Sequence, residues 1–135
     1  WLGGNNNYGQ LGDGNHGRLE DGTEIFRNVP VQIGTDTNWR TLAAGTSHSL
    51  ALKTDGTLWG WGWNYFGQLG DGTVISKSVP LQIGTNTDWL TVISGYRHSL
   101  ALKTDGTLWA WGSNSSGRLG DGTEISRKIP TVIKY

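Results

Sequence analysis

The sequence contains no cysteine and no methionine. Without thiols the chain forms no disulfide, no thiolate metal site and no cysteine nucleophile, although a cysteine-free chain is compatible with reducing and oxidising compartments alike. The missing initiator methionine has a separate consequence. Because the chain begins at Trp1, in the middle of a pattern that is complete further on, we expect it to come from a longer or processed polypeptide.

Charge of one sign and long apolar runs are missing too. Eleven basic residues balance eleven acidic residues, and neither sign forms a run. This balance disfavours an extended surface for nucleic acid or for anionic membranes. No apolar stretch approaches the roughly 20 residues that a transmembrane helix needs, and no secretory signal peptide is visible. We therefore expect neither nucleic-acid binding nor membrane insertion.

A repeat dominates what is present. Residues 48–59 return unchanged as residues 98–109, an offset of 98 − 48 = 50. When residues 39–83 are aligned with residues 89–133, 28 of 45 positions are identical. A period of this length indicates a structural unit that is arrayed side by side. Residues shared by the copies are then expected to maintain the scaffold, whereas function is expected where the copies differ.

Each complete unit predicts four short strands and no helix. In the first complete unit the strands cover residues 39–44, 48–53, 58–61 and 80–83. The second and third are joined by a turn that contains Asp-Gly, a strong hairpin signal between two apolar runs. The second strand carries apolar or small residues on both faces, since His48, Leu50 and Leu52 alternate with Ser49, Ala51 and Lys53. Neighbouring sheets must therefore cover both sides, as blades around a propeller axis do.

Residues 1–33 form a partial unit. Residues 1–14 align with residues 59–72 at an offset of 58, and residues 17–23 align with residues 67–73 at an offset of 50. Both alignments hold if an eight-residue loop segment, 15–22, was duplicated in tandem. We therefore expect a partial blade with only the last two strands over residues 1–33, followed by complete blades over residues 34–83 and 84–135.

The sequence motif of the repeat resembles that of a known family. The shared pattern reads Gly-x-x-His-Ser-Leu-Ala-Leu-Lys-Thr-Asp-Gly-Thr-Leu-Trp, followed by Trp-Gly-x-Asn-x-x-Gly-Gln/Arg-Leu-Gly-Asp-Gly-Thr and a later Pro. It is similar to the regulator of chromosome condensation repeat over essentially the whole chain. The resemblance implies an all-β fold, a β-propeller usually of seven blades with four antiparallel strands and about 50 residues in each. This chain would supply about two and a half of those blades.

The resemblance also implies a function. It points to a non-catalytic protein-interaction or structural scaffold. We expect it to have a protein partner and no cofactor, with self-association or completion by flanking blades as a further expectation. Known members include an exchange factor for a small nuclear GTPase, a plant ultraviolet-B photoreceptor and a secreted inhibitor of β-lactamase. A regulatory propeller that acts on an enzyme is therefore the alternative, and only the 15–22 duplication offers the insertion that exchange activity needs. The Leu-Trp-x-Trp-Gly motif is most similar to the motifs of bacterial members, many of which are secreted or lie on the cell surface.

The duplicated polar residues invite a catalytic interpretation, which strand geometry opposes. Both copies contain the residue types of a hydrolytic triad, as His48-Ser49 with Asp55 and as His98-Ser99 with Asp105. Adjacent strand residues point to opposite faces, so Ser49 does not reach His48. Asp55 belongs to a turn, where local hydrogen bonds favour aspartate. We therefore expect a buried histidine bonded to the backbone and assign a structural role to six residues: His48, His98, Asp55, Asp105, Trp59 and Trp109.

Two further patterns are weaker still. The segment 12–17 fits G-x-G-x-x-G, but a dinucleotide site requires a strand before it and a helix after it, and neither is expected. Four residues with side-chain oxygens cluster in the same loop: Asp13, Asn15, Glu20 and Asp21. Their spacing does not fit the helix-flanked calcium loop. We therefore predict no catalytic residue, no cofactor site and no metal site, and hence no enzyme.

Positions that differ between the copies are the candidates for recognition. Three aromatic residues occupy loop positions that differ between the copies. Trp63, Tyr65 and Phe66 stand where the next copy has Ser113, Ser115 and Ser116 and the partial unit has Asn5, Asn7 and Tyr8. Tyr96 and Arg97 likewise replace Thr46 and Ser47. Because aromatic clusters dominate interface energetics, we predict that Trp63, Tyr65, Phe66, Tyr96 and Arg97 bind a protein partner. Packing against a neighbouring blade is the alternative for the three loop aromatics.

Overall fold

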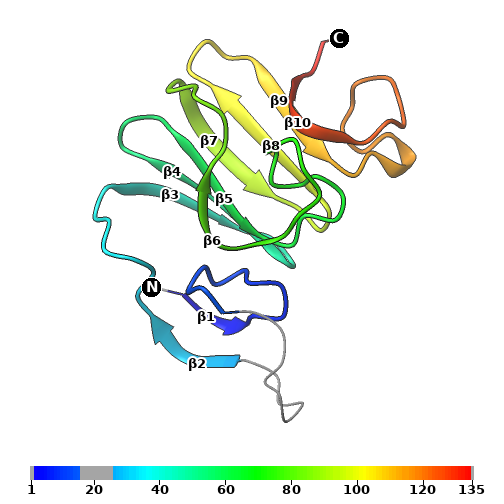
Figure 1. The fold of residues 1–135 in the computed structure, drawn as a ribbon. Helices are drawn as coiled ribbons and strands as arrows, with labels where there is room; N and C mark the ends of the chain where they lie inside the picture. The colour runs from blue at the N-terminus through cyan, green and yellow to red at the C-terminus, as the bar shows by residue number, and fades with distance from the viewer. Residues whose placement is uncertain (1, 16–25, 135) are drawn as a thin grey trace.

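The computed structural model describes residues 2–15 and 26–134, which form three antiparallel sheets in chain order (Figure 1). The first sheet pairs β1 (Leu2–Asn5) with β2 (Phe26–Val31). The second has the order β3 (Trp39–Ala44), β4 (His48–Lys53), β5 (Leu58–Gly62) and β6 (Lys77–Gln82). The third has the order β7 (Trp89–Ser94), β8 (His98–Lys103), β9 (Leu108–Gly112) and β10 (Arg127–Val132).

The two four-stranded sheets share one register. Trp39 of β3 pairs with Lys53 of β4, and Trp89 of β7 pairs with Lys103 of β8, with a bulge after each pair. The first three predicted strands of the unit are confirmed to within one residue. The predicted absence of long helices also holds in the described ranges, where the one helical element is the 3₁₀ turn η1 (Ser115–Gly117). No helix in those ranges is long and apolar enough to cross a membrane.

The fourth strand begins earlier than predicted. β6 starts at Lys77, because a register shift between Gly60 and Gly62 of β5 lets Lys77 pair with Gly62. The sequence predicts a strand that begins at Pro80, since proline donates no backbone hydrogen bond. β6 lies at the edge of its sheet, and an edge strand tolerates proline in its interior.

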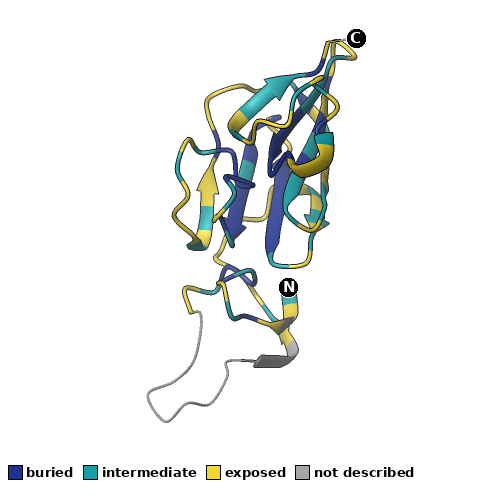
Figure 2. Ribbon diagram, turned by 90° about the vertical axis from the view of Figure 1, so that its right-hand side faces the viewer, coloured by how far each residue is buried: buried dark blue, intermediate teal, exposed yellow. Residues whose placement is uncertain are grey.

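β4 is buried on both faces, as the alternation of its side chains predicts. All six of its residues are buried, and Figure 2 shows that buried residues concentrate in the central strands while exposed ones follow the loops and outer strands. On one face, the Ser49 hydroxyl donates to the carbonyl oxygen of Gln10 at 2.8 Å. On the other face, Leu50 and Leu52 enter a core shared with the third sheet.

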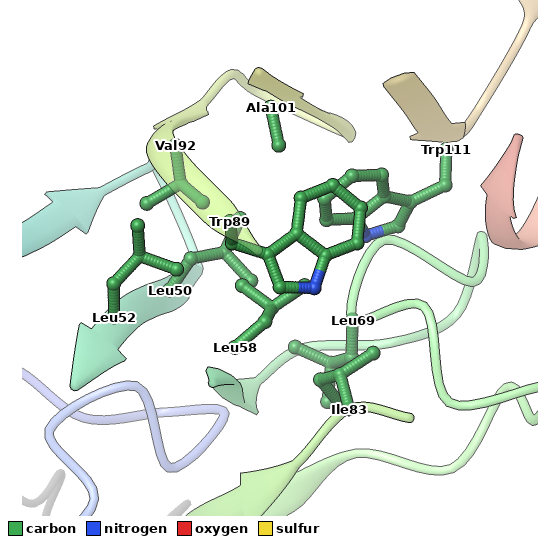
Figure 3. Close-up of a cluster of buried hydrophobic side chains, with 9 residues drawn as sticks. All are labelled: Leu50, Leu52, Leu58, Leu69, Ile83, Trp89, Val92, Ala101 and Trp111. Atoms are coloured by element: carbon green, nitrogen blue, oxygen red, sulfur yellow. The ribbon is translucent and has the colours of Figure 1, made fainter. Parts of the chain in front are cut away.

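That shared core holds the second and third sheets together. Figure 3 shows leucines of β4 and β5 beside Val92 and the indole of Trp89. Its buried members are Leu50, Leu52, Leu58, Leu69, Ile83, Trp89, Val92, Ala101 and Trp111. Full burial of one large apolar side chain contributes roughly 1.5–3 kcal/mol, so this interface is the main source of hydrophobic stabilisation between the sheets.

The outer face of the third sheet repeats the same leucines without a cover. Leu100, Leu102 and Leu108 occupy the positions of Leu50, Leu52 and Leu58. The three leucines of the second sheet are fully buried, whereas Leu102 is 36% exposed and its two companions are half-buried. The outer face of the third sheet therefore carries the same apolar residues that, in the second sheet, pack against a neighbouring sheet.

The two-stranded sheet follows the register of the next unit. Leu2 pairs with Val31 as Gly60 pairs with Leu81, which corresponds to offsets of 60 − 2 = 58 and 81 − 31 = 50. The eight additional residues of this unit thus fall between β1 and β2. Apart from Asn15, the segment 15–22 lies outside the described residues, so its origin by duplication and the proposed unit boundaries stay predictions.

The repeat offers a matched pair for testing this core. We expect Leu58→Ala to cost roughly 3–5 kcal/mol in the free energy of unfolding, because it leaves a cavity among fully buried side chains. Leu108→Ala makes the same change at a half-buried site and should cost about 1 kcal/mol in the 135-residue chain. Urea unfolding of both variants measures the difference. Equal costs would show that the outer face of the third sheet is covered in solution.

Candidate partner-binding surface

Neighbouring units are joined through one carbonyl oxygen in each of the first two long loops. The carbonyl oxygen of Gln68 accepts hydrogen bonds from the Ser99 hydroxyl at 2.7 Å and from the Trp111 indole at 2.8 Å. The carbonyl oxygen of Gln10 accepts the same pair of bonds from Ser49 and Trp61, each at 2.8 Å. We call this arrangement the clasp. It fixes the loop of one unit against the second and third strands of the next.

A glycine lets the indole reach the clasp. Gly70 has φ of +84°, a conformation that side chains other than hydrogen rarely adopt. A β-carbon at Gly70 would lie 2.8 Å from Nε1 of Trp111. Gly12 stands in the same relation to Trp61. The glycines of the Gly-Gln-Leu-Gly segment therefore serve the contact between units as well as the turn.

His48 is bonded to the clasp rather than to the backbone, which corrects the sequence-based expectation. Its Nε2 lies 3.0 Å from the Ser99 hydroxyl, and the ring is fully buried. Because Ser99 donates its single proton to Gln68, it accepts from Nε2, which assigns the Nε2–H tautomer. Burial lowers the pKa of His48 to about 4, and the nearby ring of His98 adds to the shift. His48 is therefore neutral and links two units.

The residues of the suspected triad are separated. Ser49 bonds Gln10, while His48 meets Ser99 of the following unit. Asp55 accepts hydrogen bonds from the backbone and the hydroxyl of Thr57 at 3.0 and 2.6 Å, and these bonds lower the pKa of its carboxyl. Asp105 does the same with Thr107 in the third sheet. Nδ1 of His48 has no hydrogen-bond partner in the described part of the chain, so no carboxylate described there supports the His48–Ser99 pair, and Ser99 is fully buried.

The recurring tryptophans pack around a lysine in each sheet. The Trp59 indole donates to Thr57 at 2.8 Å, so it is tied to the Asp55 turn. Lys53 Nζ lies 3.9 Å from the Trp59 ring centroid and 2.7 Å from the Asp36 carboxylate. The third sheet repeats this arrangement with Trp109, Lys103 and Asp88. These contacts give Asp55, Asp105, Trp59 and Trp109 positions within the scaffold.

Asn64 organises the long loop that carries the candidate aromatics. Its amide nitrogen lies 3.1 Å from the Asp71 carboxylate and from the carbonyl oxygens of Thr73 and Ile75. Its side-chain oxygen accepts from the amide of Leu69 at 2.9 Å, and the residue is fully buried. Asn6 and Asn114 occupy the same place in the other units. The loop is therefore fixed from within, and the residues on either side of Asn64 are free to vary.

The predicted loop aromatics lie together on the surface. Trp63 lies 6.4 Å from Tyr65 and 5.4 Å from Phe66, measured between ring centroids. Tyr8 of the first unit stacks on Trp63 at 5.2 Å. Tyr65 is 67% exposed and Tyr8 is 43% exposed, while Trp63 and Phe66 are half-buried. The rings thus form a continuous strip with an exposed outer side.

The second candidate pair joins this strip. The Cζ atom of Arg97 lies 4.8 Å from the Phe66 ring centroid, 4.9 Å from that of Tyr96 and 6.0 Å from that of Trp63. All five predicted binding residues therefore meet at one place, although they come from two units. We call this set, together with Tyr8, the aromatic–arginine surface.

Sequence reasoning missed two residues of this region. Tyr8 was noted as an equivalent of Phe66 but not as a candidate, although its being aromatic in a variable position was a usable signal. Asn64 was hidden in a loop whose glycine and asparagine content indicates only a turn. Its recurrence as Asn6 and Asn114 was the signal that each loop needs the same internal bonds. Of the four loop residues whose spacing does not fit a calcium site, Glu20 and Asp21 lie outside the described residues.

Comparison with known proteins identifies the family. The model of the regulator of chromosome condensation (RCC1) repeat matches residues 1–52 and 55–102, and a second model of the same repeat matches residues 39–68 and 92–118. The chain belongs to the RCC1 repeat family. Its sheets are accordingly blades of a β-propeller. Propellers of this family are in general regulators or binders rather than catalysts.

Three similar proteins place the chain within the family. It is 42% identical over 62 residues to the ultraviolet-B receptor UVR8 of Arabidopsis thaliana, covering 44% of this chain and 12% of the receptor. It superposes on Saccharomyces cerevisiae Prp20p with a TM-score of 0.82 and 26% identity, covering 98% of this chain and 33% of Prp20p. Human WBSCR16 gives a TM-score of 0.78 and 28% identity, with 97% and 33% covered.

These comparisons also show how much of its relatives' length the chain covers and from which organisms those relatives come. The RCC1-repeat chain spans about a third of the length of the two solved structures. The structure of Prp20p is described with its binding to Gsp1p and histones, and a second structure holds Prp20 with Kap60. The relatives named here come from a plant, a yeast and human, so they lend no support to the expected bacterial origin or cell-surface location.

The loop network predicts a large effect for Asn64. Asn64→Ala should lower the free energy of unfolding by about 3 kcal/mol or more, because several buried donors and acceptors lose their partner at once. Asn86→Ala removes an exposed asparagine and should change stability by less than about 0.5 kcal/mol. Urea unfolding compares the two. A near-neutral Asn64→Ala variant would contradict the organising role.

His48 predicts a pH dependence of stability. Its pKa is lowered from 6.5 to about 4 in the folded chain, so the unfolded chain binds the proton first as the pH falls. Stability from this group is complete above pH 6.5 and should decrease by about 3 kcal/mol as the pH falls toward 4. Chemical unfolding at several pH values, compared with His48→Gln, isolates this part. An identical slope in the variant would refute the assignment.

Proposed function

We propose that the chain is a non-catalytic protein-interaction module of a β-propeller and that its partner binds the aromatic–arginine surface. One observation carries the proposal. The positions that break the repeat converge, since Arg97 lies 4.8 Å from the centroid of Phe66, a residue of the preceding unit. A scaffold gains nothing from large aromatics where the next copy functions with serine. Recognition explains why they gather.

The physical character of the surface supports binding. Aromatic residues and arginine are the types that contribute most to interface energy when they are desolvated. Here the rings support one another at 5.2–6.4 Å, so little side-chain entropy is lost when a partner covers them. Tyr65 and Tyr96 are the most exposed rings of this surface, at 67% and 52%.

A regulatory propeller acting on an enzyme is the second candidate. The likeness to Prp20p, at a TM-score of 0.82 over 98% of this chain, favours it. Prp20p is described as binding Gsp1p. In this chain the one candidate for a dedicated insertion, segment 15–22, lies outside the described residues apart from Asn15. The two candidates share a protein partner and differ in what that partner is.

A copy-swap variant tests the proposed module. Changing Trp63, Tyr65 and Phe66 to serine installs the residues of the next unit, Ser113, Ser115 and Ser116. The fold should persist, while affinity for a protein captured by the immobilised wild-type chain should fall by roughly 2–4 kcal/mol, the scale of a hot-spot cluster. Biolayer interferometry measures the affinity, and thermal melting reports the fold.

His48→Ala is the control for that variant. It removes the buried bond to Ser99 and should lower stability by about 1–3 kcal/mol, with only an indirect effect on binding. Undiminished binding by the triple serine variant would overturn the proposal. So would the reverse pattern, in which the serine variant melts while His48→Ala stays stable, because the division between scaffold and recognition residues would then be wrong.

A further inference from the structure

Arg97 forms no ion pair with an acidic residue in the described part of the chain. The ion pairs there join Lys53 to Asp36, Lys103 to Asp88 and Arg127 to Asp121. The guanidinium of Arg97 makes no hydrogen bond to any described residue, and its Nε is buried without a partner. A buried donor on a charged group is costly when it is left unpaired. Nε is closed to an external acceptor, but the two terminal nitrogens of Arg97 are not buried in this way and present unused donors to one.

The aromatic rings hold this guanidinium without using those donors. Phe66 and Tyr96 lie within 4.9 Å of Cζ, and Trp63 lies at 6.0 Å. Contacts with ring faces are made by the charge and the flat face of the group, whereas its N–H bonds point outward in the guanidinium plane. A planar fork held in this way matches a carboxylate, which accepts two parallel hydrogen bonds.

The surrounding charges favour an acidic ligand over a basic one. Arg118 is an exposed cation at the same end of the third sheet, and its charge contributes to the lowered pKa of His98, after burial. The two aspartates of the adjacent loops, Asp71 and Asp121, are bonded within their loops, whereas Glu124 of the third unit's loop is exposed. Asp71 accepts from Asn64 and Thr73, and Asp121 pairs with Arg127 at 2.7 Å.

We propose that the aromatic–arginine surface binds an acidic segment of a protein, in which one Asp or Glu carboxylate pairs with the guanidinium of Arg97. An aromatic or large aliphatic side chain next to that carboxylate lies on the exposed rings of Tyr65 and Tyr8. This inference rests on the proposed function and adds the chemistry of the partner. The other unit has Thr46 and Ser47 in place of Tyr96 and Arg97, so the scaffold does not require the arginine.

A peptide-display selection tests the inference without a known partner. Random twelve-residue peptides are selected on the immobilised full chain, and individual synthetic peptides are then titrated by fluorescence anisotropy. We expect Asp or Glu beside an aromatic or large aliphatic residue in the selected sequences. Replacing that acid by its amide should weaken binding by about tenfold or more, the range of a charge-assisted bidentate pair.

The repeat supplies matched variants for the titration. Arg97→Ser installs the residue of the other unit, and Arg97→Lys keeps the charge but removes the fork. Both should weaken binding by about tenfold or more, without adding to the loss caused by the amide substitution in the peptide. Arg118→Gln removes an equal charge and installs the residue found at position 68. It should weaken binding by no more than about twofold, through long-range attraction alone.

The outcomes separate this inference from the proposed function. If the selected peptides lose affinity for the Trp63, Tyr65 and Phe66 serine variant but bind the Arg97 variants normally, the acidic partner is excluded and the binding surface stands. If Arg118→Gln weakens binding as much as Arg97→Ser, general attraction replaces the specific pair and the inference fails. If the peptides are indifferent to both the aromatic and the Arg97 variants, the proposed surface itself is wrong.

Discussion

The structure depends on a single backbone carbonyl in each of the first two long loops. In the second sheet's loop this is the carbonyl of Gln68, which accepts both Ser99 and Trp111 of the following unit. Two donors on one oxygen fix the distance and the angle between units, which apolar packing alone leaves less well defined. His48 reinforces the same point from the other side, because its bond to Ser99 can form only when both units are in place. The leucine core then adds area to an interface whose geometry the clasp has already set.

The loop that supplies this carbonyl has two separate tasks. Asn64 and Gln68 point into the protein and hold the loop, whereas Trp63, Tyr65 and Phe66 alternate with them and face outward or along the surface. The bonds that Asn64 makes recur with Asn114 in the next unit, so they do not depend on the side chains at the intervening positions. Loops held by the same internal bonds therefore carry serines in one unit and aromatics in another, with a local difference at Ser116, whose φ is +61°. This separation is what allows the chain to carry a specific surface on a repetitive scaffold.

The first three strands of the unit could be predicted from the sequence because each depends on a few neighbouring residues. Alternation in residues 48–53 and the Asp55-Gly56 turn are contained in a few neighbouring positions. The contacts between units could not be read, since His48 and Ser99 each recur as His98 and Ser49. Identical copies do not reveal whether a histidine meets the serine beside it or the one 51 residues away. The predicted start of β6 is wrong for a related reason, because a bulge within β6, opposite Trp61 of β5, decides where the pairing begins.

The candidate binding residues could be identified from the sequence, but their proximity could not. Comparing copies singled out Trp63, Tyr65, Phe66, Tyr96 and Arg97 as unusual, but their proximity depends on the angle between two sheets. That angle is set by the clasp, so residues with no place in the surface determine its shape. Tyr8 enters for the same reason, since it reaches Trp63 only across the first junction. A binding surface assembled from three units is thus as rigid as the junctions between them, and its preorganisation comes from the interactions that hold the propeller together.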